Sequence, residues 1–228
     1  MNEEEELKNA GVYLYNEGKY ESALAKFLLT SQTDLGISMM YLGFCYTRLK
    51  QFDAAIIALE SIHYELLTPS QYTQSKLSLG YLYTETEQLD KAHSLFESLS
   101  DYAPENSQIW ALWGYVGQLQ GSYDVAVRRY RKAINLDNGN ANALNSLAYL
   151  YAMIDDISHL EEALGHARRA VSISPQNASY LDTLGWICLK LNKKSDALEY
   201  LQRALSLREN DPVIKEHLEA ARHAVTKR

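Results

Sequence analysis

Apolar residues recur three or four positions apart along most of the chain, and polar residues occupy the positions between them. This spacing places one apolar stripe along an α-helix, so the pattern predicts a chain of amphipathic helices. Residues 79–99 illustrate it, with one stripe that includes Leu79 and Tyr83 and a second that includes Leu89 and Phe96. The break between the two stripes predicts a pair of short helices joined by a turn.

Turn-forming residues separate the helical stretches at regular places. Gly18 and Gly121 lie where a chain that reverses between two helices needs a left-handed backbone, and Asn192 is an accepted substitute there. In three of the predicted helix pairs, a proline follows the second helix and marks its end. These prolines are Pro104, Pro175 and Pro212. The pattern therefore predicts antiparallel helical hairpins that follow one another along the chain.

The hairpins repeat with a constant internal spacing. A small residue recurs in the first helix at separations of 32, 37, 34, 34 and 37 residues, at Gly11, Gly43, Gly80, Gly114, Ala148 and Gly185. A second small residue follows 12 positions later, or 15 in the fifth unit, at Ala23, Ala55, Ala92, Ala126, Ala163 and Ala197. A larger side chain at the glycines would hold the two helices apart. The sequence therefore predicts six units of about 34 residues.

These positions resemble the tetratricopeptide repeat family, whose pattern places Leu-Gly and Tyr in the first helix, Ala and Phe in the second, and Pro at the end. The third unit carries the whole set: Leu79, Gly80, Tyr83, Ala92, Phe96 and Pro104. The fourth and sixth units depart from it, with Gly117 and Cys188 where the family prefers Tyr. The resemblance implies an all-α fold, a right-handed α-α superhelix of antiparallel hairpins.

The resemblance and the spacing together predict one solenoid domain over residues 1–228. The expected repeats are residues 4–35, 36–72, 73–106, 107–140, 141–177 and 178–211, followed by a capping helix over 212–228. A stripe of Ile214, Leu218, Ala221 and Val225 would cover the open apolar face of the last hairpin. Two units are longer than the period, and we expect their extra residues in loops at 67–70 and 155–159.

Composition narrows the class of protein further. Apolar residues make up 46% of the chain, which excludes a chain disordered by composition, and the net charge of −7 disfavours general nucleic-acid binding. The start resembles no signal peptide and no run is long enough to span a membrane, so we expect a cytoplasmic protein without membrane insertion. Charge is uneven, however. Residues 1–125 carry 7 Lys and Arg against 17 Asp and Glu, whereas 126–228 carry 15 against 12.

Catalytic chemistry is not predicted. The chain contains no P-loop, zinc-protease, serine-hydrolase or Cys-x-x-Cys motif, so we expect no enzyme, no catalytic residue and no cofactor. His159, Glu162 and His166 lie close in sequence, but a zinc site needs a fourth ligand, and surface side chains on a charged helix are the simpler interpretation. Cys45 and Cys188 are expected to be buried, inert thiols.

The residue after each small position carries the candidate binding surface. In the resembled family this position points into the concave groove, and here it is aromatic in five consecutive units: Phe44, Tyr81, Tyr115, Tyr149 and Trp186. One helical turn before or after them lie the apolar residues Met40, Leu77, Leu119 and Met153. We therefore expect a groove that is apolar and aromatic in its middle, with charge confined to its ends. The alternative is that these rings pack against the next unit.

The resemblance implies a protein-protein interaction adaptor or scaffold that binds a peptide or a helix of a partner in this groove. The family's clamp for a C-terminal carboxylate is not expected, because Lys8 matches its pattern but Val12, Tyr41, Gln74 and Ser78 occupy the other positions. Two other functions stay open at this point. One is a secretion- or assembly-type chaperone for a specific client, and the other is a self-assembling scaffold whose partner is a second copy of the chain.

Overall fold

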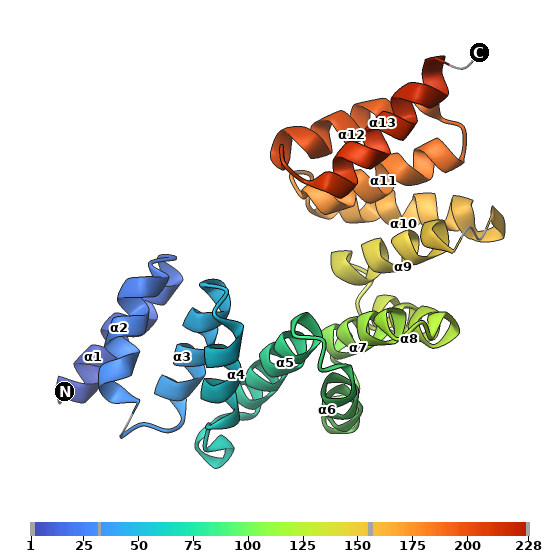
Figure 1. The fold of residues 1–228 in the computed structure, drawn as a ribbon. Helices are drawn as coiled ribbons and strands as arrows, with labels where there is room; N and C mark the ends of the chain where they lie inside the picture. The colour runs from blue at the N-terminus through green and yellow to red at the C-terminus, as the bar shows by residue number, and fades with distance from the viewer. Residues whose placement is uncertain (1–2, 32, 155–156, 227–228) are drawn as a thin grey trace. The chain divides into compact units, whose positions relative to one another are not determined.

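The computed structural model describes residues 3–31, 33–154 and 157–226 (Figure 1). Within these ranges the chain forms thirteen α-helices and two short 3-10 helices, η1 and η2, and it forms no strand. The all-α repeat architecture is confirmed. The chain divides into two compact units, Met1–Pro104 and Glu105–Arg228, and each is described by itself. One continuous solenoid over the whole chain stays a prediction.

Unit 1 contains three helical hairpins. The helices are α1 (Glu3–Asn16), α2 (Tyr20–Thr30), α3 (Ile37–Arg48), α4 (Phe52–Glu60), η1 (Tyr64–Leu66), α5 (Pro69–Glu85) and α6 (Leu89–Tyr102). Each odd-numbered helix packs on the helix that follows it, and α2 and α4 also pack on the first helix of the next hairpin. The core of this unit therefore forms between successive hairpins, as a repeat protein requires.

Unit 2 contains three further hairpins and a final helix. The helices are α7 (Ser107–Leu119), α8 (Tyr123–Leu136), α9 (Ala141–Met153), η2 (Ile157–His159), α10 (Leu160–Ile173), α11 (Ala178–Lys190), α12 (Lys194–Leu207) and α13 (Pro212–Thr226). Helix α13 packs on α12 and α11, where Ile214, Leu218 and Ala221 are buried while Val225 is exposed. The apolar stripe predicted for this helix is thus buried except at its last residue.

The glycines of the first helices are where the two helices of a hairpin touch. A Cβ at Gly43 would lie 2.6 Å from Cδ2 of Leu59, and a Cβ at Gly80 would overlap the ring of Phe96. Each such glycine meets the residue sixteen positions later; the pairs are Gly11–Phe27, Gly43–Leu59, Gly80–Phe96, Gly114–Tyr130 and Gly185–Leu201. The predicted reason for the small residue, close approach of two helices, is confirmed at these five positions.

In five hairpins, a residue with a left-handed backbone conformation follows the first helix. Gly18, Gly121 and Asn192 have φ values of 74°, 73° and 57°, as their sequence positions predict. Lys50 and Glu87 occupy the same place in the second and third hairpins, with φ of 59° at both. The backbone hydrogen bonds repeat as well: Lys50 N donates to Thr47 O and the next amide, of Gln51, donates to Tyr46 O at 2.9 Å. The geometry is that of a Schellman motif, which glycine adopts without strain.

Replacing Lys50 or Glu87 by Gly is expected to stabilise the protein. A non-glycine residue in this conformation costs about 1–2 kcal/mol, whereas glycine adds about 0.5–1 kcal/mol of unfolded-state entropy. Each variant should therefore raise the free energy of unfolding by about 0.5–1 kcal/mol in urea melts followed by circular dichroism. Gly121→Ala is the matched control and should lower it, because its added Cβ meets nothing within 4 Å and only the backbone is strained. A loss of stability in Lys50→Gly would contradict this explanation.

The extra residues of the second repeat form a defined connection rather than an open loop. Tyr64 in η1 donates through its hydroxyl to Leu59 O at 2.8 Å, and Lys76 Nζ lies 3.7 Å from the centre of its ring. Pro69 begins α5, and Thr68 accepts a hydrogen bond from the backbone N–H of Gln71 in a capping box. The predicted loop at 67–70 is therefore partly helical, because proline at the first helical position and a threonine cap favour an early helix start.

The extra residues of the fifth repeat lie between α9 and α10. Asp155 and Asp156 lie outside the described residues, and Ile157–His159 forms the 3-10 helix η2. The ring of His159 stacks on Tyr151 with centroids 4.7 Å apart. The described part of this turn is therefore packed against α9.

Candidate functional site

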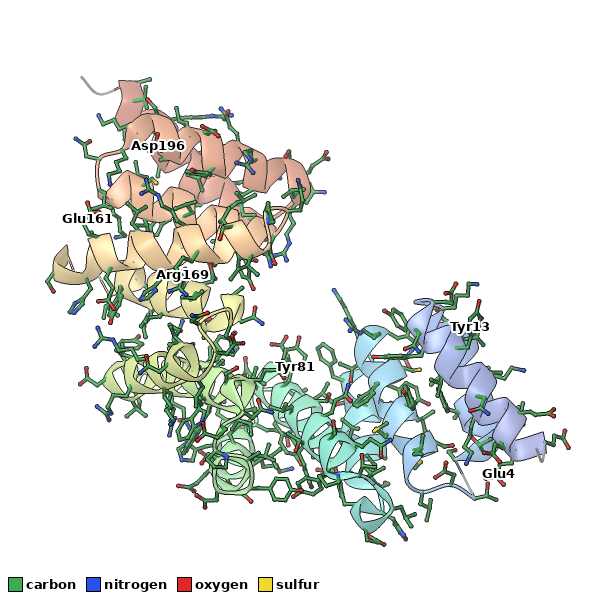
Figure 2. The ribbon with its side chains drawn as sticks, turned by 180° about the vertical axis from the view of Figure 1, so that it is seen from behind. Glu4, Tyr13, Tyr81, Glu161, Arg169 and Asp196 are labelled. Carbon is green, nitrogen blue, oxygen red and sulfur yellow. The ribbon has the colours of Figure 1, made fainter. Side chains whose placement is uncertain are left out.

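Unit 1 contains a cavity of about 660 Å³ between the first helices of its hairpins. It is lined by Tyr15, Phe44, Thr47, Arg48, Lys50, Phe52, Gln74, Ser78, Tyr81 and Glu85. Four of these side chains are aromatic, and Tyr81 projects from α5 (Figure 2). Charge enters the same cavity with Arg48, Lys50 and Glu85, of which the first lies 5.9 Å from the ring centre of Tyr20. The cavity can therefore take an apolar group beside an ionic or polar one.

Unit 2 contains a second cavity, of about 390 Å³, which also lies between the first helices of its hairpins. Its walls come from α7, α9, α11 and the start of α13: Tyr115, Gln118, Asn145, Ser146, Tyr149, Ser179, Asp182, Thr183, Asp211, Val213 and Ile214. Of these lining residues none is Lys or Arg, whereas two are aspartates. Three successive first helices thus share one cavity in which hydrogen-bond acceptors surround two tyrosines.

Most acceptors of the unit 2 cavity are held in position by other groups. Asp182 Oδ1 lies 2.9 Å from Nδ1 of His217 on α13, and Asp211 Oδ1 accepts the backbone N–H of Val213 at 3.0 Å. Gln118 Oε1 accepts the hydroxyl of Tyr130 at 3.0 Å. Burial raises the pKa of Tyr130 well above its usual value, so this hydroxyl stays a donor. The polar walls are therefore already ordered before any ligand binds.

Four of the five predicted aromatic residues line one or the other of the two cavities. Phe44 and Tyr81 line the unit 1 cavity, and Tyr115 and Tyr149 line the unit 2 cavity. Trp186 lines neither of the two; its ring stacks on His217 with centroids 4.2 Å apart. For Trp186, the alternative that the ring packs against a neighbouring helix is therefore the one observed.

None of the four apolar residues predicted to flank the aromatic ones lines either cavity. Met40 and Leu77 are only 2% and 9% exposed, so their side chains belong to the core and offer little surface to a partner. Leu119 and Met153 are exposed, but neither lines either cavity.

Charged residues line both cavities. Arg48 and Glu85 stand among the aromatic rings of unit 1, and Asp182 and Asp211 stand beside the tyrosines of unit 2. Charge is therefore part of each cavity wall. Each wall also includes polar residues three positions away from the aromatic ones on the same helix face, and none of the expected groove positions covers them. These lining residues are Thr47, Ser78, Gln118, Ser146 and Thr183.

The departure at Gly117 has a structural explanation. Arg129 Nη1 would lie 3.3 Å from a Cβ at Gly117, and it donates to the backbone oxygen of Trp113 at 3.2 Å. The guanidinium carbon is 3.6 Å from the ring centre of Trp113. An arginine that stacks on the tryptophan therefore takes the space that the family gives to Tyr. Arg129 is thus a packing residue.

The residues considered for metal or thiol chemistry are engaged elsewhere. Glu162, on the same helix as the labelled Glu161 and Arg169 (Figure 2), is 3.1 Å from Arg131 Nη2 and 3.4 Å from His166 Nε2. Over residues 3–31, 33–154 and 157–226, no group of three His, Cys, Asp or Glu is placed to hold a metal ion. Cys45 and Cys188 are buried free thiols, and burial raises their pKa to about 12 and about 11.

Repeated hairpins with cavities along their first helices define an all-α repeat protein of the protein-interaction type. A family model described as tetratricopeptide repeat matches residues 44–217, and the chain belongs to this family. Among the helices in the described part of the chain, none is long and apolar enough to cross a membrane.

Curated proteins and solved structures are similar to parts or most of this chain. The type IV pilus assembly protein PilF of Pseudomonas aeruginosa is 28% identical over 114 residues, which is 49% of this chain and 44% of that protein. The chain thus spans less than half the length of the curated relatives it matches. A chain in the crystal structure of the APC/C hetero-tetramer Cut9–Hcn1 is similar over 94% of this chain and 42% of its own length, with a TM-score of 0.81 and 16% identity. A tetratricopeptide repeat protein from Parabacteroides merdae matches over 95% and 83%, with a TM-score of 0.73 and 19% identity.

Proposed function

We propose that this chain is a non-enzymatic adaptor or scaffold that binds an extended segment or a helix of a partner protein at its tyrosine-lined cavities. The observation that carries the proposal is the unit 2 cavity, where Tyr115 and Tyr149 are half-buried on neighbouring first helices. Half-buried rings over ordered polar walls are typical of protein-binding hot spots. The absence of an enzymatic role and the cytoplasmic location stay predictions.

The free energy gained by burying the tyrosine rings supports a specific interaction with a partner. Completing the burial of one aromatic side chain contributes up to about 1.5–3 kcal/mol. Three or four engaged rings would together contribute about 5–12 kcal/mol, and micromolar binding corresponds to about −8 kcal/mol, so further contacts must offset the cost of ordering the partner. The cavities of about 660 and 390 Å³ are in the range that protein pockets use for side chains and small ligands.

Paired baits test this function. The whole chain and a Tyr81→Ala/Tyr115→Ala/Tyr149→Ala variant are used to capture proteins from a lysate of the source cell, which mass spectrometry identifies. A third bait replaces exposed tyrosines that line neither cavity, Tyr13, Tyr102 and Tyr123. We expect a partner that the wild type and the third bait both hold and the first variant loses, with helicity unchanged by circular dichroism. A partner retained by the cavity variant and lost by the third bait would place binding on the outer surface.

An assembly chaperone is the second candidate, favoured by the pilus assembly relative. A chaperone must raise the soluble yield of its client, whereas an adaptor leaves it unchanged. Co-expression of the captured partner with the wild type or with the cavity variant separates the two functions. More soluble partner with the wild type alone supports the chaperone.

A further inference from the structure

We infer that the unit 2 cavity receives the cationic end of a Lys or Arg side chain from the partner segment, an inference that rests on the proposed function. Asp182 and Asp211 both line this cavity, and the residues that line it include no cation. A ligand group of positive charge is the complement of such a wall, because a group of like charge would be repelled.

An unused acceptor lies in the same wall. Oδ1 of Asn145 is buried, and no donor within hydrogen-bond distance is found for it among the described residues. A buried acceptor without a partner costs about 1–3 kcal/mol, which a donor from a ligand removes. An ammonium or guanidinium group brings several N–H donors at once, so one group can serve Asn145 and a neighbouring aspartate.

Two basic side chains outside the cavity wall already pair with its aspartates, so a cation from the partner would share these carboxylates with them. Arg208 Nη1 lies 3.8 Å from Asp211 Oδ2 and donates to Ser179 Oγ at 3.1 Å, but its side chain is not part of the cavity wall. His217 approaches Asp182 from α13 and is likewise not among the lining residues. The rings of Tyr115 and Tyr149 complete the wall, and aromatic rings attract a cation that lies over their faces. Acceptors, carboxylates and aromatic rings thus converge on one space.

The unit 1 cavity provides a contrast within the same chain. It is lined by Arg48 and Lys50 as well as Glu85, so its wall is not selective for a cation. Glu97→Gln, at an exposed residue of α6 that lines neither cavity, changes the net charge of the protein by the same amount as Asp211→Asn. The two variants therefore separate a local effect of the unit 2 cavity from a general effect of charge.

Selected peptides provide the probe. Random peptides of about twelve residues, displayed on phage, are selected on the whole wild-type chain and counter-selected on the Tyr115→Ala/Tyr149→Ala variant. Selected peptides are synthesised together with versions in which each Lys or Arg is replaced by Met. We expect one Lys or Arg in each peptide whose replacement weakens binding about tenfold, as loss of one charge-assisted interaction predicts.

Protein variants then locate that interaction. Asp211→Asn keeps a good helix cap for α13 and should weaken the Lys peptide about fivefold, with little change for its Met version. Asn145→Asp adds a carboxylate of the same shape and should strengthen the Lys peptide several-fold, a gain that misfolding cannot produce. Glu97→Gln should change the binding of neither peptide.

The outcomes distinguish the inference from the function beneath it. Peptides that need Tyr115 and Tyr149 but tolerate Met at every Lys and Arg would overturn the cation site and leave the interaction function intact. Weaker binding of the Lys peptide to Asn145→Asp would overturn the cation site as well. If no selected peptide depends on Tyr115 and Tyr149, both the site and the proposed groove are wrong.

Discussion

Gly80→Ala should lower the free energy of unfolding by about 2 kcal/mol, although alanine is the better helix former. The added Cβ would overlap the ring of Phe96, which is fully buried in the core. The two helices of the hairpin must then separate, and the packing of α5 on α6 is lost. Urea unfolding followed by circular dichroism measures the change.

Gly165→Ala is the matched control for this prediction. Gly165 lies in the interior of α10, is exposed, and would place its Cβ within 4 Å of nothing. The same substitution should here raise the free energy of unfolding by about 0.8 kcal/mol through helix propensity alone. Opposite signs at the two glycines support the close-approach explanation, and equal gains at both would contradict it.

Tyr115→Ala/Tyr149→Ala should weaken partner binding about 10- to 100-fold, since completing the burial of each half-buried ring contributes about half of the 1.5–3 kcal/mol of a full burial. Isothermal titration with the captured partner measures the change. The corresponding Phe variants keep the ring area and should bind within about threefold of wild type. If the Phe variants bind as poorly as the Ala variants, the hydroxyl groups rather than the rings carry the interaction.

The repeat architecture was predictable because its constraints are local. The distance from Gly80 to Phe96 is sixteen residues, and the same interval recurs from Gly43 to Leu59. Ala148 stands in the fifth unit where the other units have glycine, and both it and Ala167 on the next helix are fully buried. Small and large residues at such short, repeated intervals are visible in the sequence alone.

The cavities were predictable only in part, because their walls combine neighbouring hairpins. One position per repeat identified Phe44, Tyr81, Tyr115 and Tyr149, all of which line a cavity. Trp186 occupies the same position but is covered by His217, because only the last hairpin is followed by α13. Asp211 lines the unit 2 cavity because it directly precedes α13, and no position of the repeat pattern corresponds to it.

Photo-crosslinking from inside a cavity tests the central claim most directly. Benzoylphenylalanine is introduced at Tyr149, in the unit 2 cavity, or at Tyr123, an exposed residue on the outer helix α8 that lines neither cavity. The account predicts a cross-link from position 149 to one short segment of the captured partner and none from position 123. Cross-links from position 123 alone, with equal partner binding by both proteins, would show that the partner occupies the outer helices and not the concave cavities.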